Sequence, residues 1–73
     1  MALVDVKTEI TGNIWKIVAA PGSRLEEDEQ ILIMESMKME IPVSAPESGV
    51  VVEILVAEGD TVTEGTVVAR IEA

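Results

Sequence analysis

One lysine stands apart among the few side chains of this chain that could take part in chemistry. The 73 residues include no cysteine and no histidine, so neither a Cys-His nor a Ser-His-Asp catalytic arrangement can be built. The sequence also lacks a glycine-rich phosphate-binding loop. Lys38 lies in the segment 35–40, ESMKME, between two apolar runs that are typical of strands. We therefore expect a protein that is not an enzyme and has no catalytic residue, with Lys38 as its reactive position.

Lys38 is expected at the tip of a β-hairpin, where a lysine is unusual. Two-residue hairpin turns favour Asn-Gly or Asp-Gly, because their central residues need special backbone angles. Met37 and Lys38 occupy these two positions instead. An exposed lysine between Glu35 and Glu40 lacks the burial or the cationic neighbour that a catalytic amine requires. Lys38 is better suited to be a substrate that a second protein modifies covalently.

The other residues near this turn have structural interpretations beside the functional ones. Met34 is expected in the core at the end of its strand, whereas Met37 and Met39 either fill gaps at the end of the core or form an apolar recognition surface. Ser36 has no base to activate it, so its hydroxyl is expected to hydrogen-bond in the turn. Trp15, the only aromatic residue, is expected to be half-exposed.

The acidic composition narrows the range of partners and locations. A net charge of −9 disfavours binding to nucleic acid and to anionic membrane surfaces. No apolar run approaches the roughly 20 residues of a membrane-spanning helix, and no signal peptide is visible. The acidic run 26–29, EEDE, lacks the spacing of a calcium loop. We expect a cytoplasmic protein with no metal site, in which this run is a solvated loop.

The chain repeats itself with an offset of 37 residues. Gly12 matches Gly49, Leu25 matches Val62, and the alignment continues without a gap to the end of the chain. Each half contains two longer segments rich in Val, Ile and Thr, separated by turn signals and a very short apolar segment. We predict strands at residues 2–8, 12–19, 24–26, 30–35, 39–45, 49–56, 61–63 and 66–72.

The repeat predicts the architecture. Neither half can bury its apolar face alone, so the two halves are expected to fold against each other. We predict one domain, residues 1–73, that is an all-β, flattened eight-stranded barrel or sandwich of two four-stranded halves related by a pseudo-two-fold axis. Adding 37 to 38 gives a position just past the chain end, so this symmetry places Lys38 at one end and both termini at the other.

The segment around Lys38 resembles the attachment motif of biotinyl domains, which is Met-Lys-Met on a hairpin. The repeat is similar to biotinyl and lipoyl domains over residues 2–73, and Gly59-Asp60 matches a turn common to that family. The resemblance implies a flattened barrel of the single-hybrid type, without the thumb insertion of some biotin carriers. It also implies that Lys38 holds covalent biotin and that the recognition and turn residues are Glu35, Ser36, Met37 and Met39.

The resemblance implies a carrier similar to biotin carboxyl carrier proteins. A biotin–protein ligase would activate biotin as an acyl-adenylate and join it to Lys38, which changes the net charge from −9 to −10. The attached biotin would swing between a biotin carboxylase and a carboxyltransferase and carry carboxyl groups from one to the other. The benefit of such a tether is a high effective concentration at both sites.

Two alternatives follow from the same segment. Most biotinyl domains have a small apolar residue where Ser36 stands, whereas lipoyl domains have Glu, then Ser or Thr, then Asp-Lys. Glu35-Ser36 is therefore similar to the lipoyl pattern, and a lipoyl or dual biotin/lipoyl acceptor, served by a lipoyl ligase, is the first alternative. The second is an unmodified interaction module that docks through its apolar tip.

Overall fold

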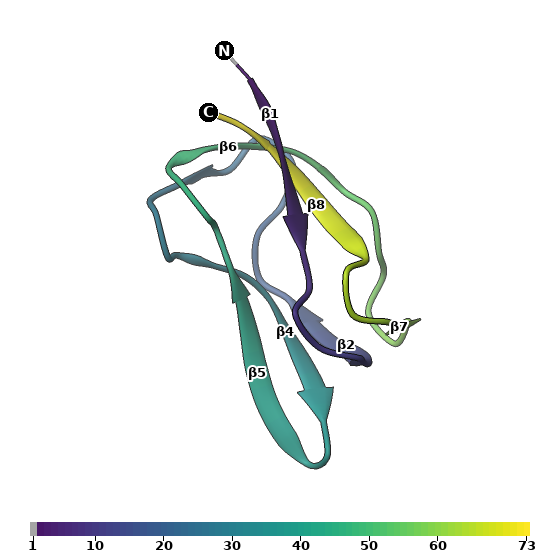
Figure 1. Cartoon of the computed structure of the whole chain (residues 1–73). Coiled ribbons are helices and arrows are strands. Elements are labelled where there is room, and N and C mark those ends of the chain that lie inside the picture. The colour runs from purple at the N-terminus through teal and green to yellow at the C-terminus, as the bar shows by residue number, and fades with distance from the viewer. Residues whose placement is uncertain (1) are drawn as a thin grey trace.

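The fold is a sandwich of two four-stranded antiparallel sheets, as the computed structural model shows for residues 2–73 (Figure 1). The strand orders are β1-β8-β6-β3 and β5-β4-β2-β7. The strands are β1 (Leu3–Lys7), β2 (Gly12–Ile17), β3 (Arg24–Leu25), β4 (Gln30–Ser36), β5 (Met39–Ser44), β6 (Gly49–Ile54), β7 (Thr61–Val62) and β8 (Val67–Glu72). The predicted all-β sandwich is confirmed, although its two sheets do not close into a single barrel.

The strand boundaries agree with the sequence pattern to within two residues. The largest differences are in β2 and β6, which end two residues earlier than predicted. In β2 the reason is visible, because the N–H groups of Val18 and Ala19 both donate to the carbonyl of Ile31, at 3.0 Å each. Two donors on one acceptor interrupt the regular ladder, and the chain turns away from the sheet.

The pairing pattern obeys the predicted two-fold relation. Met34 pairs with Ile41 between β4 and β5, and Ile71 pairs with Val4 between β8 and β1, which are equivalent positions in the repeat. The two-residue strands are exchanged, since β3 pairs with β6 and β7 pairs with β2. The short strand of the first half, β3, therefore extends the sheet that contains β6 and β8, and the short strand of the second half, β7, extends the sheet that contains β2 and β4. Neither half forms a sheet by itself.

Two glycines set how closely the equivalent strands approach. A Cβ atom on Gly12 would lie 2.6 Å from the carbonyl oxygen of Glu35, and one on Gly49 would lie 2.6 Å from that of Glu72. Both contacts are with backbone, so a larger residue would have to push the strands apart. Neighbouring strands therefore approach each other closely at equivalent positions in the two sheets.

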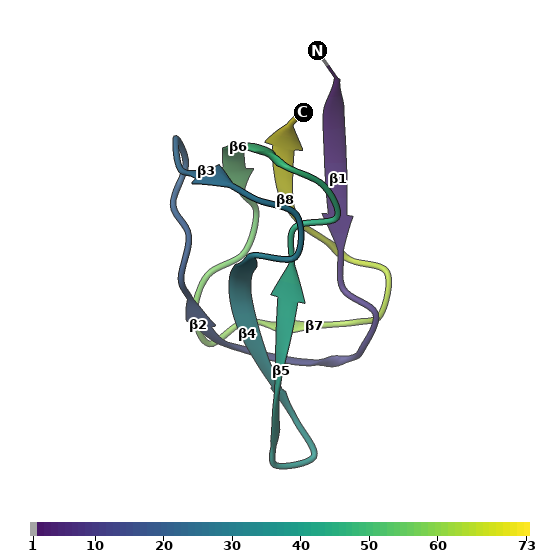
Figure 2. The same cartoon turned by 90° about the vertical axis from the view of Figure 1, so that its left-hand side faces the viewer.

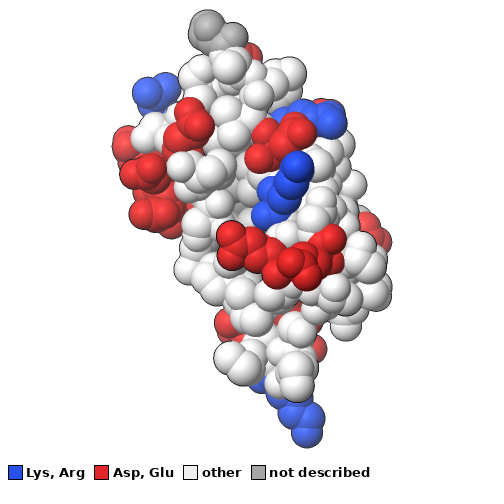
Figure 3. Space-filling view, viewed as in Figure 1, with Lys and Arg blue, Asp and Glu red and all other residues white. Residues whose placement is uncertain are grey.

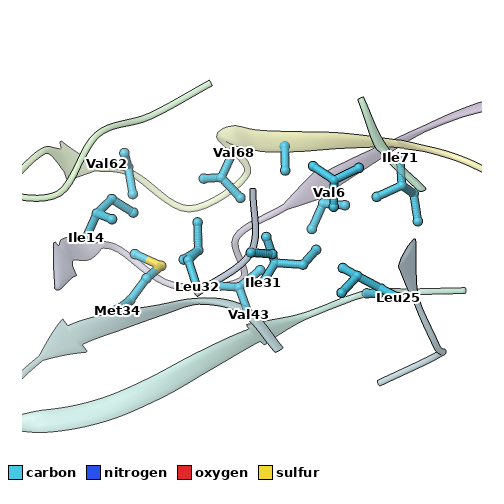
Figure 4. Close-up of a cluster of buried hydrophobic side chains, with 14 residues drawn as sticks. Val6, Ile14, Leu25, Ile31, Leu32, Met34, Val43, Val62, Val68 and Ile71 are labelled. Carbon is cyan, nitrogen blue, oxygen red and sulfur yellow. The ribbon is translucent and has the colours of Figure 1, made fainter. Parts of the chain in front are cut away.

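The core is aliphatic and lies between the two sheets (Figure 4). Ile31, Leu32 and Met34 of β4 are fully buried, so the prediction that Met34 lies in the core is confirmed. Trp15 is 47% exposed, also as predicted, because it is the extra residue of a β-bulge between Ile14 and Lys16. Bulged residues leave the regular alternation of a strand, and here the indole is turned outward.

The molecule is elongated, with extents of 36 × 17 × 17 Å. The β4–β5 hairpin forms one end, and both termini lie at the other end (Figures 1 and 2). Ala2 and Ala73 exchange two backbone hydrogen bonds, of 3.1 and 3.0 Å, and so hold the described chain ends together. The predicted separation of the lysine turn from the termini is confirmed.

Candidate functional site

The candidate site is the tip of the β4–β5 hairpin, residues 36–39. Ser36 and Met39 are the last paired residues, so Met37 and Lys38 form a two-residue turn, as the sequence predicted. Their φ angles are +51° and +65°, the left-handed values of a type I′ turn. Residues with a side chain adopt this conformation at a cost of about 1–2 kcal/mol each. The turn therefore contains two long side chains at positions where Asn-Gly would have a lower conformational free energy.

The two methionines of the tip are exposed. The exposed fractions are 91% for Met37 and 62% for Met39, and the Lys38 side chain between them is exposed too. Basic side-chain atoms project beyond the end of this hairpin in the space-filling view (Figure 3). The interpretation of Met37 and Met39 as packing at the end of the core is therefore wrong. These side chains are instead presented to solvent on either side of Lys38 in the chain.

The hairpin base is attached to the loop between β1 and β2. The hydroxyl of Ser36 donates to the carbonyl of Thr11 at 3.0 Å, and a Cβ atom on Gly12 would lie 3.1 Å from the Cβ atom of Ser36. Ser36 was expected to hydrogen-bond within the turn, and this expectation is wrong because the acceptor is in a distant part of the sequence. The bond links the tip to the body of the sandwich and restricts how far the hairpin can swing.

The charged residues around the tip do not form ion pairs with one another. Glu35 and Glu40 are directly opposite each other across the hairpin, an arrangement of like charges that disfavours pairing. Lys38 makes no salt bridge with any residue of the described part, 2–73. Its amine is therefore free to enter a partner's site without first breaking an ionic contact.

The cation Arg70 behaves differently. Its guanidinium contacts Glu53 at 2.6 Å and Asp5 at 3.0 Å on the sheet that carries the termini. The hydrogen bonds that Arg70 donates to Glu53 and, to a smaller extent, to Asp5 raise the pKa of Arg70 above its ordinary value. Arg70 is thus held by structural contacts, whereas Lys38 is not. Lys7 and Lys16 are exposed residues of β1 and β2, as expected for the outer faces.

Other site types have no support among residues 2–73. These residues contain no group of three or more Asp or Glu side chains placed to hold a metal ion. The acidic run 26–29 is exposed, and the Glu29 carboxylate accepts a hydrogen bond of 3.1 Å from the N–H of Glu26 within its own loop. No helix that could cross a membrane occurs in this part of the chain.

Comparison with known proteins agrees with this geometry. Residues 3–71 match the family model described as Biotin-requiring enzyme. The biotin/lipoyl attachment protein of Bacillus subtilis is 42% identical over 68 residues, which are 93% of this chain and 93% of that protein. The chain belongs to the biotin/lipoyl attachment family. Members of this family carry covalently attached biotin or lipoate and act as carrier domains rather than as catalysts.

Solved structures of this family include both kinds of carrier. The urea carboxylase of Kluyveromyces lactis contains a region similar to the whole fold, with a TM-score of 0.93 and 40% identity, covering 99% of this chain and 6% of the carboxylase. The lipoyl domain of the 2-oxoglutarate dehydrogenase complex of Azotobacter vinelandii has a TM-score of 0.78 and 29% identity, with 96% of each chain covered. Both similarities extend over nearly all of this biotin/lipoyl attachment domain.

Many relatives of this attachment domain are larger proteins. They include components of biotin-dependent carboxylases and of dihydrolipoyllysine-residue acyltransferase complexes, of which the chain spans 6–13%. The fold and the carrier role are therefore shared across two chemistries.

Proposed function

We propose that Lys38 is the attachment residue of a biotin carrier. The observation that carries this proposal is the tip geometry: an unpaired, exposed lysine in a two-residue turn, at the end of the molecule opposite the termini. A covalent arm needs no binding pocket on its carrier. It needs an accessible amine that is held away from the body of the domain, and Lys38 meets both requirements.

The side chains next to the amine favour biotin. Met37 and Met39 match the Met-Lys-Met motif that this segment resembles, and both present their apolar atoms to solvent. The similarity in structure and sequence is also greater to the urea carboxylase than to the lipoyl domain. A ligase that binds the apolar tip reads residues 37 and 39 directly on either side of the amine that it acylates.

The second candidate is lipoate, either alone or in addition to biotin. Glu35-Ser36 is similar to the pattern before the acceptor lysine of lipoyl domains, and the Bacillus subtilis relative is named for both groups. The Ser36 hydroxyl donates to the carbonyl of Thr11, and Ser36 remains partly exposed. We expect Ser36 to affect ligase choice through the position of the hairpin.

The chemistry at Lys38 is acyl transfer catalysed by a biotin–protein ligase. The amine nitrogen attacks the acyl carbon of biotinyl-adenylate, AMP leaves, and the nitrogen loses a proton as the amide forms. The attached group then supplies a site for reversible carboxylation. Biotin carboxylase and carboxyltransferase components are the partners that we propose for the modified domain. The domain itself contributes reach and presentation, since its tethered arm raises the effective concentration at each partner site.

A paired ligase assay tests this proposal. The unmodified chain is incubated with ATP and either biotin with a biotin–protein ligase or lipoate with a lipoyl ligase. We expect efficient transfer of biotin and slower transfer of lipoate, measured as initial rates by intact mass. Faster transfer of lipoate would replace the biotin proposal with the second candidate. Absence of both products from a folded chain would contradict the carrier function.

A further inference from the structure

The methionines of the described chain fall into two sets. Met37 is 91% exposed and Met39 is 62% exposed, whereas Met34 is completely buried. Thioethers react with peroxides according to how well the oxidant reaches the sulfur, and the product is methionine sulfoxide. The structure therefore places two reactive sulfur atoms beside Lys38 and shields the third.

The buried sulfur of Met34 also makes a polar contact. Its Sδ atom lies 3.0 Å from the hydroxyl of Thr8, which is itself buried. The methionine side chain packs in the core with Ile14 and Leu32. An oxidant would have to open the sandwich to reach it, so Met34 is an internal reference for the exposed pair.

We propose that Met37 and Met39 form a peroxide-sensitive modification site that controls whether Lys38 is acylated. This inference rests on the proposed function, because it needs a ligase that binds the tip. In the reaction a sulfur lone pair attacks one oxygen of hydrogen peroxide and the O–O bond breaks. The sulfur is oxidised to a sulfoxide, and the peroxide is reduced to one molecule of water.

The position of the two methionines makes their oxidation matter for Lys38. They precede and follow the lysine directly in a turn whose two central φ angles are positive, so a protein that reaches the amine meets both side chains. The next residues outward, Glu35 and Glu40, are exposed carboxylates. Met37 and Met39 thus supply the apolar contact at the tip, and a sulfoxide changes that contact into a polar one.

The modification leaves the charge of the domain unchanged. A sulfoxide is neutral, so the net charge of −9 stays the same and the long-range electrostatic field of the domain is not altered. The core is untouched as well, because the oxidised side chains are exposed. The effect is therefore expected in the short-range recognition of the tip, and it is reversible by methionine sulfoxide reductases.

The test combines site mapping with ligase kinetics. The whole chain is treated with dilute hydrogen peroxide and fragmented for mass analysis, which separates residues 34, 37 and 39. We expect oxidation of Met37 first, then Met39, with Met34 protected. The initial rate of biotin transfer to the oxidised chain is expected to fall by about tenfold, the factor that 1.4 kcal/mol of lost contact produces. Treatment with the two stereospecific reductases is expected to restore it.

Two variants provide matched controls. The double variant Met37→Leu, Met39→Leu keeps apolar side chains without an oxidisable sulfur, so its labelling is expected to be insensitive to peroxide. The variant Met34→Leu removes only the buried sulfur and is expected to remain sensitive. Unchanged labelling of a chain oxidised at Met37 and Met39, or oxidation of Met34 at the rate of the exposed pair, would overturn the proposal.

The same experiment separates this inference from the proposed function. Labelling of the untreated chain reports the carrier role alone. An untreated chain that accepts biotin, together with an oxidised chain that accepts it equally well, would leave the carrier role intact and refute the peroxide control. A folded, untreated chain that accepts neither biotin nor lipoate would refute the carrier role and the control with it.

Discussion

The two ends of the molecule are built from equivalent positions of the repeat, but they differ in structure. At the hairpin end, Ser36 pairs with Met39, and the chain continues through Met37 and Lys38. At the other end, the equivalent pair is Ala73 and Ala2, which hydrogen-bond to each other. The same scaffold therefore presents a closed, protruding turn at one end and the termini at the other (Figure 1).

The difference between the ends shows which residues are structural and which are functional. Glu35 faces Glu40 across the hairpin, whereas the equivalent residues at the terminal end are Glu72 and Leu3. The terminal end tolerates small and apolar residues, while the hairpin end carries exposed methionines, opposed carboxylates and strained backbone. Among residues 2–73, three non-glycine residues have positive φ angles, and two of them, Met37 and Lys38, form this turn, while the third, Asp28, lies in another loop. Backbone strain of this kind is often found at functional sites.

The largest effect is expected from removing the amine. Lys38→Arg keeps the charge and the length of the side chain but takes away the nucleophile, so labelling by biotin–protein ligase is expected to disappear. Circular dichroism and thermal unfolding of the variant are expected to match the parent chain. Lys16→Arg is the control, because Lys16 is an exposed residue of β2 outside the tip. Residual labelling of Lys38→Arg would contradict a single attachment site.

The recognition role of Met37 can be tested by changing ligase preference. Met37→Asp makes the segment similar to the lipoyl pattern, so the ratio of lipoyl to biotin transfer is expected to rise by about tenfold, equivalent to 1.4 kcal/mol. The ratio comes from initial rates with both ligases. Met39→Asp adds the same charge at the other flank without making the lipoyl pattern, so it separates the effect of charge from the effect of position 37. An unchanged ratio for Met37→Asp would show that the ligases do not read this residue.

A matched pair of glycine variants compares the two ends of the molecule directly. A Cβ at either Gly12 or Gly49 would lie 2.6 Å from a backbone oxygen, so Gly12→Ala and Gly49→Ala are each expected to destabilise the fold by about 1–3 kcal/mol. A Cβ on Gly12 would also lie 3.1 Å from the Cβ of Ser36, at the base of the hairpin. Only Gly12→Ala is therefore expected to slow labelling, measured well below the unfolding temperature of each variant. Equal slowing by both would mean that general stability governs labelling.

Relief of backbone strain in the turn is expected to stabilise the fold, in contrast to the glycine variants, and by a smaller amount. Asn tolerates the left-handed conformation better than Met, so Met37→Asn is expected to stabilise the fold by about 1 kcal/mol. The same variant loses an apolar contact and is expected to be labelled more slowly. Denaturant unfolding and ligase rates measure the two effects separately. A stabilised variant with unchanged labelling would indicate that Met37 serves only the turn.

The smallest effect is expected at Arg70. Its contacts with Asp5 and Glu53 are exposed, and exposed ion pairs add little to stability because solvent screens them. Arg70→Ala is expected to lower the melting temperature only slightly and to leave labelling unchanged. A clear loss of labelling in this variant would show that the sheet with the termini communicates with the hairpin tip.

Much of the fold was predictable because the repeat supplies two independent copies of each strand pattern. The strands, the turn at Met37-Lys38 and the burial of Met34 followed from alternation, turn signals and the offset of 37 residues. The exchange of β3 and β7 between halves was not predictable, since strands of two residues carry no information about their partners. The bond from Ser36 to Thr11 depends on tertiary packing in the same way.

We propose that Lys38 receives the covalent group, and fragmentation of the modified chain locates that group. The chain is incubated with biotin, ATP and a biotin–protein ligase, and the product is analysed by intact mass and then by tandem fragmentation. We predict one biotinyl group per chain, located on Lys38 and absent from Lys7 and Lys16. A group on either of those lysines, or several groups per chain, would contradict it.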